Sequence, residues 1–500
     1  MNAYTFKSKF GGMHMPIEMK NVSFSYDLLE EPLFKNINIS IDNTWKLGLI
    51  GRNGRGKTTL LHLLQNKLPY SGTVTSDEEF HYFPLLIRDI KVSTYYAIDE
   101  VMPVELWKLE RECQLLSLDP STLWMPFEQL SGGEQTKVML AAVFCEENRF
   151  LLLDEPTNHL DMKGRSIVAN YLKKKKGFIV VSHDRQFIDE VVTHILAIEK
   201  SQLSLYKGNF SIYEQQKKLQ DEFELEQNRS LNTEINRLQK TAREKANWAA
   251  QREKPSGNDP FGNAIAKRMN KRAKAMEKRT QEKIEDKTKL LKNIETISDL
   301  TINCQFKHRN PVLRVKNFTL SYSDQPLFQP ISFEIFQGEQ VAIVGPNGSG
   351  KTSLVQYLQG TFPGTADGEM IMPQGLSTSV IRQNYEDNQG MLKDFAFEQQ
   401  IDYTLFLNNL RIFGFNRDVF QVPIEKMSMG QQKKVEFSKS LGLEAEFYIW
   451  DEPLNYLDVF NQKQIEKMIA QFKPTLLFVE HDATFVKNTA TKVIELLPNR

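Results

Sequence analysis

The sequence has few cysteines and no long apolar segment. Its 500 residues include only Cys113, Cys145 and Cys304, an odd number at wide spacing that excludes a disulfide framework and a cysteine-ligated metal cluster. No apolar run approaches the ~20 residues that cross a bilayer. The first ten residues, MNAYTFKSKF, lack the apolar core of a signal peptide. We therefore expect a cytoplasmic protein without a membrane partner.

The chain also has no net charge, because Lys and Arg together number 63 and Asp and Glu together number 63. This balance means that any contact with nucleic acid must come from a local basic patch. The length exceeds one comfortable hydrophobic core and, at ~150 residues for each domain, predicts about three structural units.

What the sequence does contain is one phosphate-binding motif, present twice. GRNGRGKT begins at Gly51 and GPNGSGKT at Gly345, and both match the G-x-x-x-x-G-K-[ST] pattern in full. Each follows an apolar strand and leads into a helix, so loop N–H groups and the helix N-terminus face anionic oxygens. The residues expected to bind the two nucleotides are Gly51, Arg52, Asn53, Gly54, Arg55, Gly56, Lys57, Thr58 and Thr59, and Gly345, Pro346, Asn347, Gly348, Ser349, Gly350, Lys351, Thr352 and Ser353.

These residue types suit ATP with Mg²⁺. Lys57 and Lys351 place a positive charge near the β- and γ-phosphates, and the hydroxyls of Thr58 and Thr352 face the metal ion. About a hundred residues after the lysine in each half, an apolar strand ends in paired acids, FLLLDEP and FYIWDEP. We expect its aspartates, Asp154 and Asp451, to hold Mg²⁺ through the water shell of the ion. The adjacent glutamates, Glu155 and Glu452, are placed to polarise the attacking water.

Three further features occur in both halves. A serine-glycine turn, LSGGEQ from Leu130 and MSMGQQ from Met427, precedes the acidic strand. A later apolar strand stops at His183 or His481, which we expect to contact the γ-phosphate. Ahead of each phosphate loop stands a tyrosine, Tyr26 or Tyr322, that can stack on adenine, although packing on a strand is the simpler reading. Short buried strands alternating with helices indicate an α/β fold with largely parallel sheets.

This order of motifs resembles the ATP-binding-cassette ATPases. The resemblance implies two nucleotide-binding domains in which the serine-glycine turn of one half closes on the nucleotide of the other. Ser428, Gly430 and Gln431 are then expected at the ATP on Lys57, and Ser131, Gly132 and Gly133 at the ATP on Lys351. A helix N-terminus at the turn suits a γ-phosphate.

Two positions depart from the family pattern. Met429 stands where the family usually has glycine in the second serine-glycine turn. The family also places a glutamine after the middle strand, in contact with Mg²⁺. Gln383 fits that place in the second half, whereas the first half offers Leu85. Both departures fall on the site built on Lys57, so we expect the two sites to turn over at different rates.

Between the two halves, the sequence from about 214 to 300 becomes rich in charged residues with helical spacing. One break, over 254–262, predicts two antiparallel helices joined by a loop. Residues 241–280 hold 11 Lys or Arg and 4 Asp or Glu, an excess of 7 positive charges. Basic side chains bind phosphates and aromatic side chains stack on bases, so this combination indicates RNA binding. The alternative is that the segment is a solvated spacer without a partner. The candidate contacts are Trp248, Lys254, Phe261, Lys267, Arg268, Lys271 and Arg272.

Twin cassettes with this linker resemble the ABC-F proteins, and most of all their Lsa-type antibiotic-resistance group. The implied domains are a first cassette over 1–213, a helical linker over 214–300 and a second cassette over 301–500. The resemblance implies an ATPase that enters the E site of the 70S ribosome beside the P-site tRNA. There its linker reaches 23S rRNA near the peptidyl-transferase centre and displaces lincosamides, pleuromutilins or streptogramin A compounds. The alternatives are a housekeeping ABC-F translation factor and the ATPase subunit of a transporter; a DNA partner is not expected.

Overall fold

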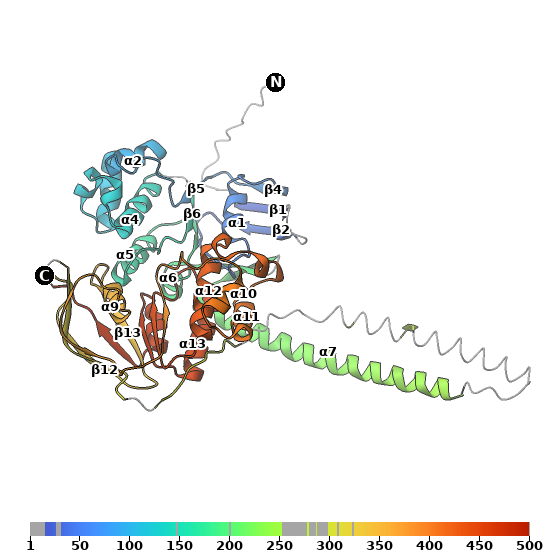
Figure 1. Ribbon diagram of the computed structural model, residues 1–500. Helices are drawn as coiled ribbons and strands as arrows, with labels where there is room; N and C mark the ends of the chain where they lie inside the picture. Colours follow the sequence, from blue (N-terminus) through green and yellow to red (C-terminus); the bar gives the residue numbers. More distant parts are fainter. Residues whose placement is uncertain are drawn as a thin grey trace, which may run out of the picture. The chain divides into compact units, whose positions relative to one another are not determined.

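The computed structural model describes residues 16–26, 32–146, 149–199, 202–252, 278–279, 287, 299–307, 310–322 and 325–499. The chain divides into two compact units, one made of Met1–Phe210 with Ser298–Arg500 and the other of Ser211–Ile297. Both cassettes belong to the first unit, in which the expected α/β architecture appears twice (Figure 1).

Two sheets form the first cassette. The smaller is antiparallel with strand order β2-β1-β4, and the larger has the order β5-β6-β7-β3-β8-β9, with only its edge strand β9 antiparallel. The central strand β7 is buried at every position, as expected for a parallel strand covered on both faces. The strands are β1 (Ile17–Phe24), β2 (Phe34–Ile41), β3 (Lys46–Ile50), β4 (Ser71–Thr75), β5 (Glu79–Phe83), β6 (Arg149–Asp154), β7 (Phe178–Val181), β8 (His194–Glu199) and β9 (Gln202–Lys207).

The helices of this cassette pack against its sheets. Helix α1 buries its leucines in the core between the two sheets, which holds its N-terminus at the carboxyl end of β3. The helices and short 3₁₀ turns are α1 (Lys57–Leu64), α2 (Thr94–Val101), α3 (Leu106–Leu115), η1 (Pro120–Trp124), η2 (Phe127–Gln129), α4 (Gly132–Val143), α5 (Met162–Leu172) and α6 (Arg185–Val191).

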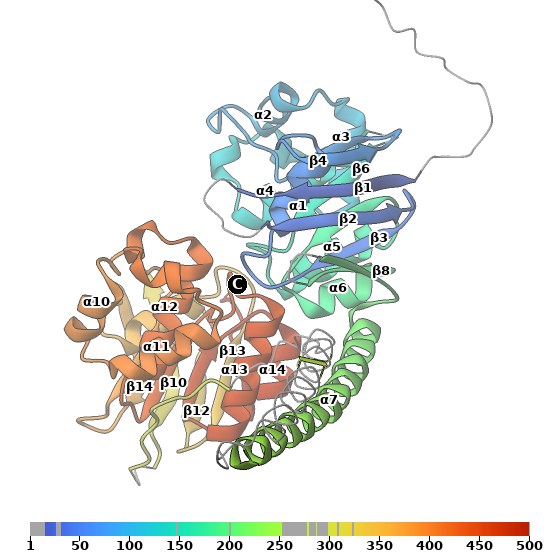
Figure 2. The same cartoon turned by 90° about the vertical axis from the view of Figure 1, so that its right-hand side faces the viewer.

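The second cassette repeats this plan (Figure 2). Strand β10 pairs with β11, β12 and β14 in an antiparallel sheet, and the parallel sheet has the order β15-β16-β17-β13-β18. Its strands are β10 (Leu313–Tyr322), β11 (Gln325–Pro326), β12 (Ile331–Ile335), β13 (Gln340–Val344), β14 (Thr365–Ile371), β15 (Thr378–Ile381), β16 (Phe447–Asp451), β17 (Leu476–Val479) and β18 (Lys492–Glu495). Its helices and 3₁₀ turns are α9 (Lys351–Leu358), α10 (Leu392–Glu398), α11 (Tyr403–Ile412), η3 (Arg417–Gln421), η4 (Ile424–Lys426), α12 (Met429–Gly442), α13 (Val459–Phe472) and α14 (Ala483–Thr489).

The interdomain segment begins as one long helix, α7 (Phe210–Arg252), drawn in green in Figures 1 and 2. On this helix Glu234 accepts a hydrogen bond of 2.6 Å from Lys287, a helical residue 53 positions later. The predicted loop over 254–262 lies between the two paired residues in the sequence. This contact brings two helical parts of the segment side by side, as an antiparallel pair requires.

Candidate active site

Each phosphate loop depends on glycine at the residue before its helix. Gly56 has φ 89° and Gly350 has φ 83°, both in the left-handed region that glycine adopts without strain. A Cβ atom on Gly56 would lie 2.7 Å from the Leu33 side chain, and one on Gly350 would lie 3.0 Å from Phe328. The helices α1 and α9 can therefore begin directly at the two lysines, as the motif predicted.

The two lysines point back into their own loops. Lys57 Nζ donates to the Gly51 carbonyl at 2.9 Å and to Asn53 Oδ1 at 3.1 Å. Lys351 Nζ donates to the carbonyls of Gly345 and Pro346 at 3.0 and 2.8 Å. Burial lowers the pKa of both amines. A phosphate bound in the loop would offset this effect of burial, because its negative charge favours the protonated lysine.

The oxygen donors beside each lysine fit Mg²⁺. Thr58 Oγ1 donates to Asp154 Oδ2 at 2.8 Å, and the Thr352 hydroxyl likewise bonds Asp451. Burial raises the pKa of Asp451 to about 6, and its Oδ1 atom is buried without a hydrogen-bond partner. Mg²⁺ is typically held by one or two carboxylates together with phosphate oxygens. A hydroxyl and a carboxylate on adjacent elements provide that donor set in each half.

The glutamates that follow have strained backbones. Glu155 has φ 51° and Glu452 has φ 45°, a left-handed conformation that costs energy in any residue other than glycine. In each half the glutamate N–H donates to the carbonyl at the end of the adjacent buried strand, at 2.9 Å to Val181 and 3.0 Å to Val479. The strain persists because the strand pairing holds this backbone in place.

The two glutamates differ in charge. Burial raises the pKa of Glu155 to about 8, and burial lowers the pKa of His183, 3.3 Å away, to about 3. Burial therefore favours the neutral form of both side chains. Burial alone would raise the pKa of Glu452, but contacts from His481, Asn455 and Gln383 outweigh it and lower the value to about 2.

The geometry of those contacts explains the difference. Asn455 Nδ2 and Gln383 Nε2 donate to Glu452 Oε2 at 2.6 and 3.3 Å, and His481 Nε2 lies 3.6 Å from Oε1. Strand pairing sets Phe83 beside Leu153 and Ile381 beside Trp450, so Leu85 occupies the place of Gln383. The first half thus has an apolar side chain where the second has a hydrogen-bond donor.

A cavity of about 620 Å³ lies at the first phosphate loop, and both cassettes line it. The second cassette contributes the N-terminus of α12, where Ser428 and Gln431 form a capping box and Met429 is half exposed. Leu85 is not among the lining residues that the structure describes. The expected site residues that line the cavity are Tyr26, Asn53, Gly54, Gly56, Lys57, Thr58, Thr59, Asp154, Glu155, His183, Ser428, Gly430 and Gln431.

The second phosphate loop also meets the opposite cassette. Asn347 Nδ2 donates to the His159 carbonyl at 3.1 Å, and a Cβ atom on Gly133 would lie 3.3 Å from that same oxygen. Ser131 caps α4 in a capping box with Glu134. The helix that begins at Ser131 therefore lies next to the loop that carries Lys351.

The two tyrosines lie at the edges of their sites. Tyr26 is 44% exposed, and its hydroxyl is 3.0 Å from Thr59 Oγ1. Tyr322 is 42% exposed, and its ring centroid is 5.0 Å from that of Phe362. Both side chains are partly exposed, and stacking on adenine stays a prediction for each.

Sequence reasoning missed two groups of residues. Asp458 Oδ2 accepts from the Asn53 N–H of the opposite loop at 2.8 Å, and Asp161 Oδ2 accepts from the Asn347 N–H at 3.4 Å. Their repetition as Asn-x-Leu-Asp after each acidic strand was the available signal. Tyr82, whose hydroxyl donates to Asp154 Oδ2 at 2.9 Å, has no counterpart in the repeat that would have identified it.

The expected RNA contacts fall at or beyond the end of α7. Trp248 belongs to that helix, but its side chain is not described. The other candidates, Lys254, Phe261, Lys267, Arg268, Lys271 and Arg272, lie outside the described residues. Their proposed roles thus depend on the sequence alone.

Comparison with known proteins agrees with this geometry. The family model described as ABC transporter matches residues 34–158 and 328–455. The chain is 32% identical to the ribosome protection protein VmlR of Bacillus subtilis, over 97% of this chain and 87% of that protein. It is 29% identical to the erythromycin resistance ATP-binding protein MsrA of Staphylococcus epidermidis, over 96% and 98% of the two chains.

A solved structure shares the fold. The archaeal ribosome recycling factor aABCE1, in a complex with the ribosomal stalk protein aP1, matches with a TM-score of 0.62 at 20% identity. The match covers 95% of this chain and 87% of that one. Within the described residues, no helix has the length and apolar character to cross a membrane. The chain belongs to the ABC-F family of ATP-binding-cassette ATPases, and its resemblance to the antibiotic-resistance group of that family is confirmed.

Proposed function

We propose that this chain binds the 70S ribosome in its ATP-bound state and protects it from antibiotics that act at the peptidyl-transferase centre. The observation that carries the proposal is the similarity, over nearly the whole chain, to one protein named for ribosome protection and to another named for erythromycin resistance. The match to the ribosome protection protein covers 97% of this chain. It therefore includes the helical linker as well as the cassettes.

The nucleotide sites act as a sandwich in this proposal. ATP with Mg²⁺ supplies the phosphoanhydride bond that is broken. Lys57 and Lys351 hold phosphate charge, and the capped helix N-termini at Ser428 and Ser131 face the opposite nucleotide. The hydrogen bonds from Asn53 in the first cassette to Asp458 and Tyr456 in the second support such a closed arrangement.

In this proposal the linker is the part of the chain that binds the rRNA near the drug. We propose domain limits of 1–213, 214–300 and 301–500, with the linker tip over 254–262. The excess of 7 positive charges over residues 241–280 suits rRNA phosphates. We place the linker in the E site, beside the P-site tRNA, with its tip at 23S rRNA near bound lincosamide, pleuromutilin or streptogramin A.

Minimum inhibitory concentrations test the linker. Cells of a susceptible bacterium express the chain, a Phe261→Ala variant, or a variant whose loop from Pro255 to Phe261 is replaced by glycine and serine. We expect a protein-dependent rise in the inhibitory concentration of a lincosamide and a pleuromutilin. Phe261→Ala should reduce that rise at matched expression and unchanged ATPase activity, and the loop replacement should abolish it.

Two results would contradict the proposal. Full protection by the loop-replaced variant would exclude the linker-tip mechanism. Growth that is equally sensitive to the lincosamide and to the pleuromutilin with and without the chain would favour the housekeeping translation factor instead.

A further inference from the structure

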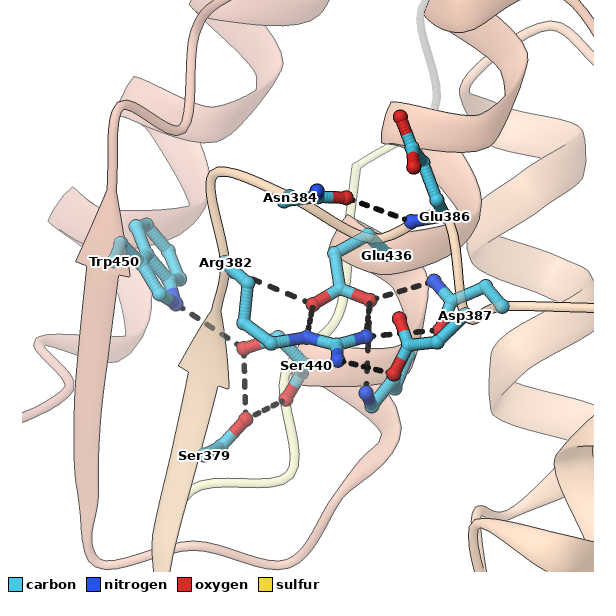
Figure 3. Close-up of polar contacts among 10 residues, drawn as sticks. Ser379, Arg382, Asn384, Glu386, Asp387, Glu436, Ser440 and Trp450 are labelled. Carbon is cyan, nitrogen blue, oxygen red and sulfur yellow. Dashed lines mark hydrogen bonds and ion pairs between the residues drawn. The ribbon is translucent and has the colours of Figure 1, made fainter. Parts of the chain in front are cut away.

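An ion-pair cluster around the buried carboxylate of Glu436 joins the segment after β15 to the helix α12 (Figure 3). Arg382 donates through Nε to Glu436 Oε1 at 3.0 Å and through Nη2 to Glu436 Oε2 at 3.3 Å. Its Nη1 atom donates to Asp387 Oδ2 at 2.6 Å, and Nη2 also donates to Asn388 Oδ1 at 3.0 Å. The guanidinium thus uses each of its three nitrogens on fixed partners, which a planar fork of donors allows.

Glu436 is fully buried, with 0% of its surface exposed. It accepts a further hydrogen bond of 2.7 Å from Asn388 Nδ2, and Lys439 Nζ lies 3.6 Å away. A buried carboxylate is tolerated only when such partners compensate its desolvation. The position of α12 is therefore tied to Arg382 at this point of the helix.

The cluster is linked to both nucleotide sites. Gln383, the residue after Arg382, donates to Glu452 in the site of Lys351. Glu436 lies eight residues from Ser428 on the same helix, about 12 Å along its axis at 1.5 Å for each residue. Ser428 lines the cavity at Lys57. One rigid helix and one ion pair thus connect Glu452 in the second site to Ser428 in the first.

The first cassette has different residues in the equivalent places. Strand pairing puts Pro84 where the second cassette has Arg382, and helix position puts Met139 where it has Glu436. Proline has no N–H and no charge, and methionine offers no carboxylate. An equivalent ion pair cannot form between Pro84 and Met139.

We propose that Arg382 and Glu436 are positioning residues that transmit the state of the second nucleotide site to the first. When Gln383 and Glu452 engage the second site, the ion pair fixes α12 so that Ser428 meets the nucleotide on Lys57. The corresponding route through α4, from the first site to the second, has no such ion pair, so the two routes between the sites are unequal. This inference rests on the proposed assignment of the two ATP sites and is independent of ribosome binding.

The test measures each ATP site separately by inactivating the glutamate of the other site. In a Glu452→Gln background only the first site turns over, and in a Glu155→Gln background only the second does. Arg382→Met combined with Glu436→Met removes both charges of the ion pair, in imitation of Met139. We expect the first-site kcat to fall by about 10-fold or more with little change in KM, because misplacement by about 1 Å can cost 10²-fold.

Ser379→Ala is the matched control. Ser379 Oγ donates to the Ser440 carbonyl at 3.0 Å, so it joins the same strand to the same helix without contacting Arg382. First-site turnover should survive this change. If the double variant unfolds early in thermal scans, Arg382→Lys serves instead, since it keeps the charge but loses the two-point contact, and a smaller fall of the same kind is expected.

Unchanged first-site kcat in a folded double variant would overturn the coupling. So would a fall confined to the Glu155→Gln background, because the pair would then serve only its own site. Failure of the site assignment is distinguishable, since near-normal turnover by the Glu155→Gln, Glu452→Gln double variant would reveal it independently.

Discussion

At the scale of single residues, the two glutamates that follow the acidic strands are chemically unequal. Glu452 is held by donors that favour its carboxylate, whereas Glu155 is buried beside a neutral His183 with Leu85 in the place of a donor. A group that polarises water must be ionised to accept a proton. Under its proposed role as general base, Glu155 therefore has to lose its proton before it can accept one from water.

This difference predicts unequal pH profiles. Because burial raises the pKa of Glu155 to about 8, kcat/KM of the Glu452→Gln variant should increase from pH 7, reach half its maximum near pH 8 and level off above about pH 9. The Glu155→Gln variant depends on Glu452, whose pKa lies at about 2, and should be flat over pH 7–9. Steady-state ATPase assays at several pH values measure both. Superimposable profiles would show that the asymmetry does not reach the chemistry.

At the scale of secondary-structure elements, the N-terminus of α12 is both a structural cap and a part of the opposite site. Ser428 Oγ accepts from the Gln431 N–H, and Ser428 lines the cavity at Lys57. In the proposed sandwich, its hydroxyl and the N–H groups at the helix N-terminus face the γ-phosphate. A substitution here should affect stability and turnover separately.

We expect Ser428→Ala to cost ~1 kcal/mol of folding free energy and to lower first-site turnover by at least ~10-fold, measured in the Glu452→Gln background. Asp402→Ala is the matched control, because Asp402 caps α11 through the Leu405 N–H and lies outside the cavity lining. It should cost similar stability, seen in thermal unfolding, and leave turnover intact. Equal loss of turnover in both variants would reduce the role of Ser428 to capping.

Elements with repeated motifs could be predicted from the sequence, since phosphate loops, acidic strands and serine-glycine turns have fixed spacing. The helix starts at Lys57 and Lys351 and the α/β architecture followed from those patterns. The Arg382–Glu436 pair could not, because it joins residues 54 positions apart that no motif links. The contact of Tyr82 with Asp154 likewise depends on strand register, which periodicity alone does not supply.

At the scale of the whole molecule, the proposal requires the linker to bind RNA through local charge in a chain that is neutral overall. Lys271→Glu and Arg272→Glu, made singly, should weaken ribosome association most at low salt, and the difference from the parent protein should shrink as salt increases. Each should also reduce the slope of log K against log salt by ~1, as lost phosphate contacts do. Lys218→Glu, the same charge change at an exposed position of α7 outside residues 241–280, should have a smaller effect. Equal effects would indicate bulk charge rather than a specific patch.

The central claim is that ATP-bound cassettes hold this protein on the ribosome, and co-sedimentation of the Glu155→Gln, Glu452→Gln double variant with 70S ribosomes tests it most directly. The double variant keeps the shape of both sites and should lower ATP turnover by at least ~10²-fold, the usual cost of losing a general base. The account predicts that this variant sediments with ribosomes in ATP and is released without it. A variant that binds ATP yet stays in the supernatant, or that hydrolyses ATP at a near-normal rate, would contradict the account.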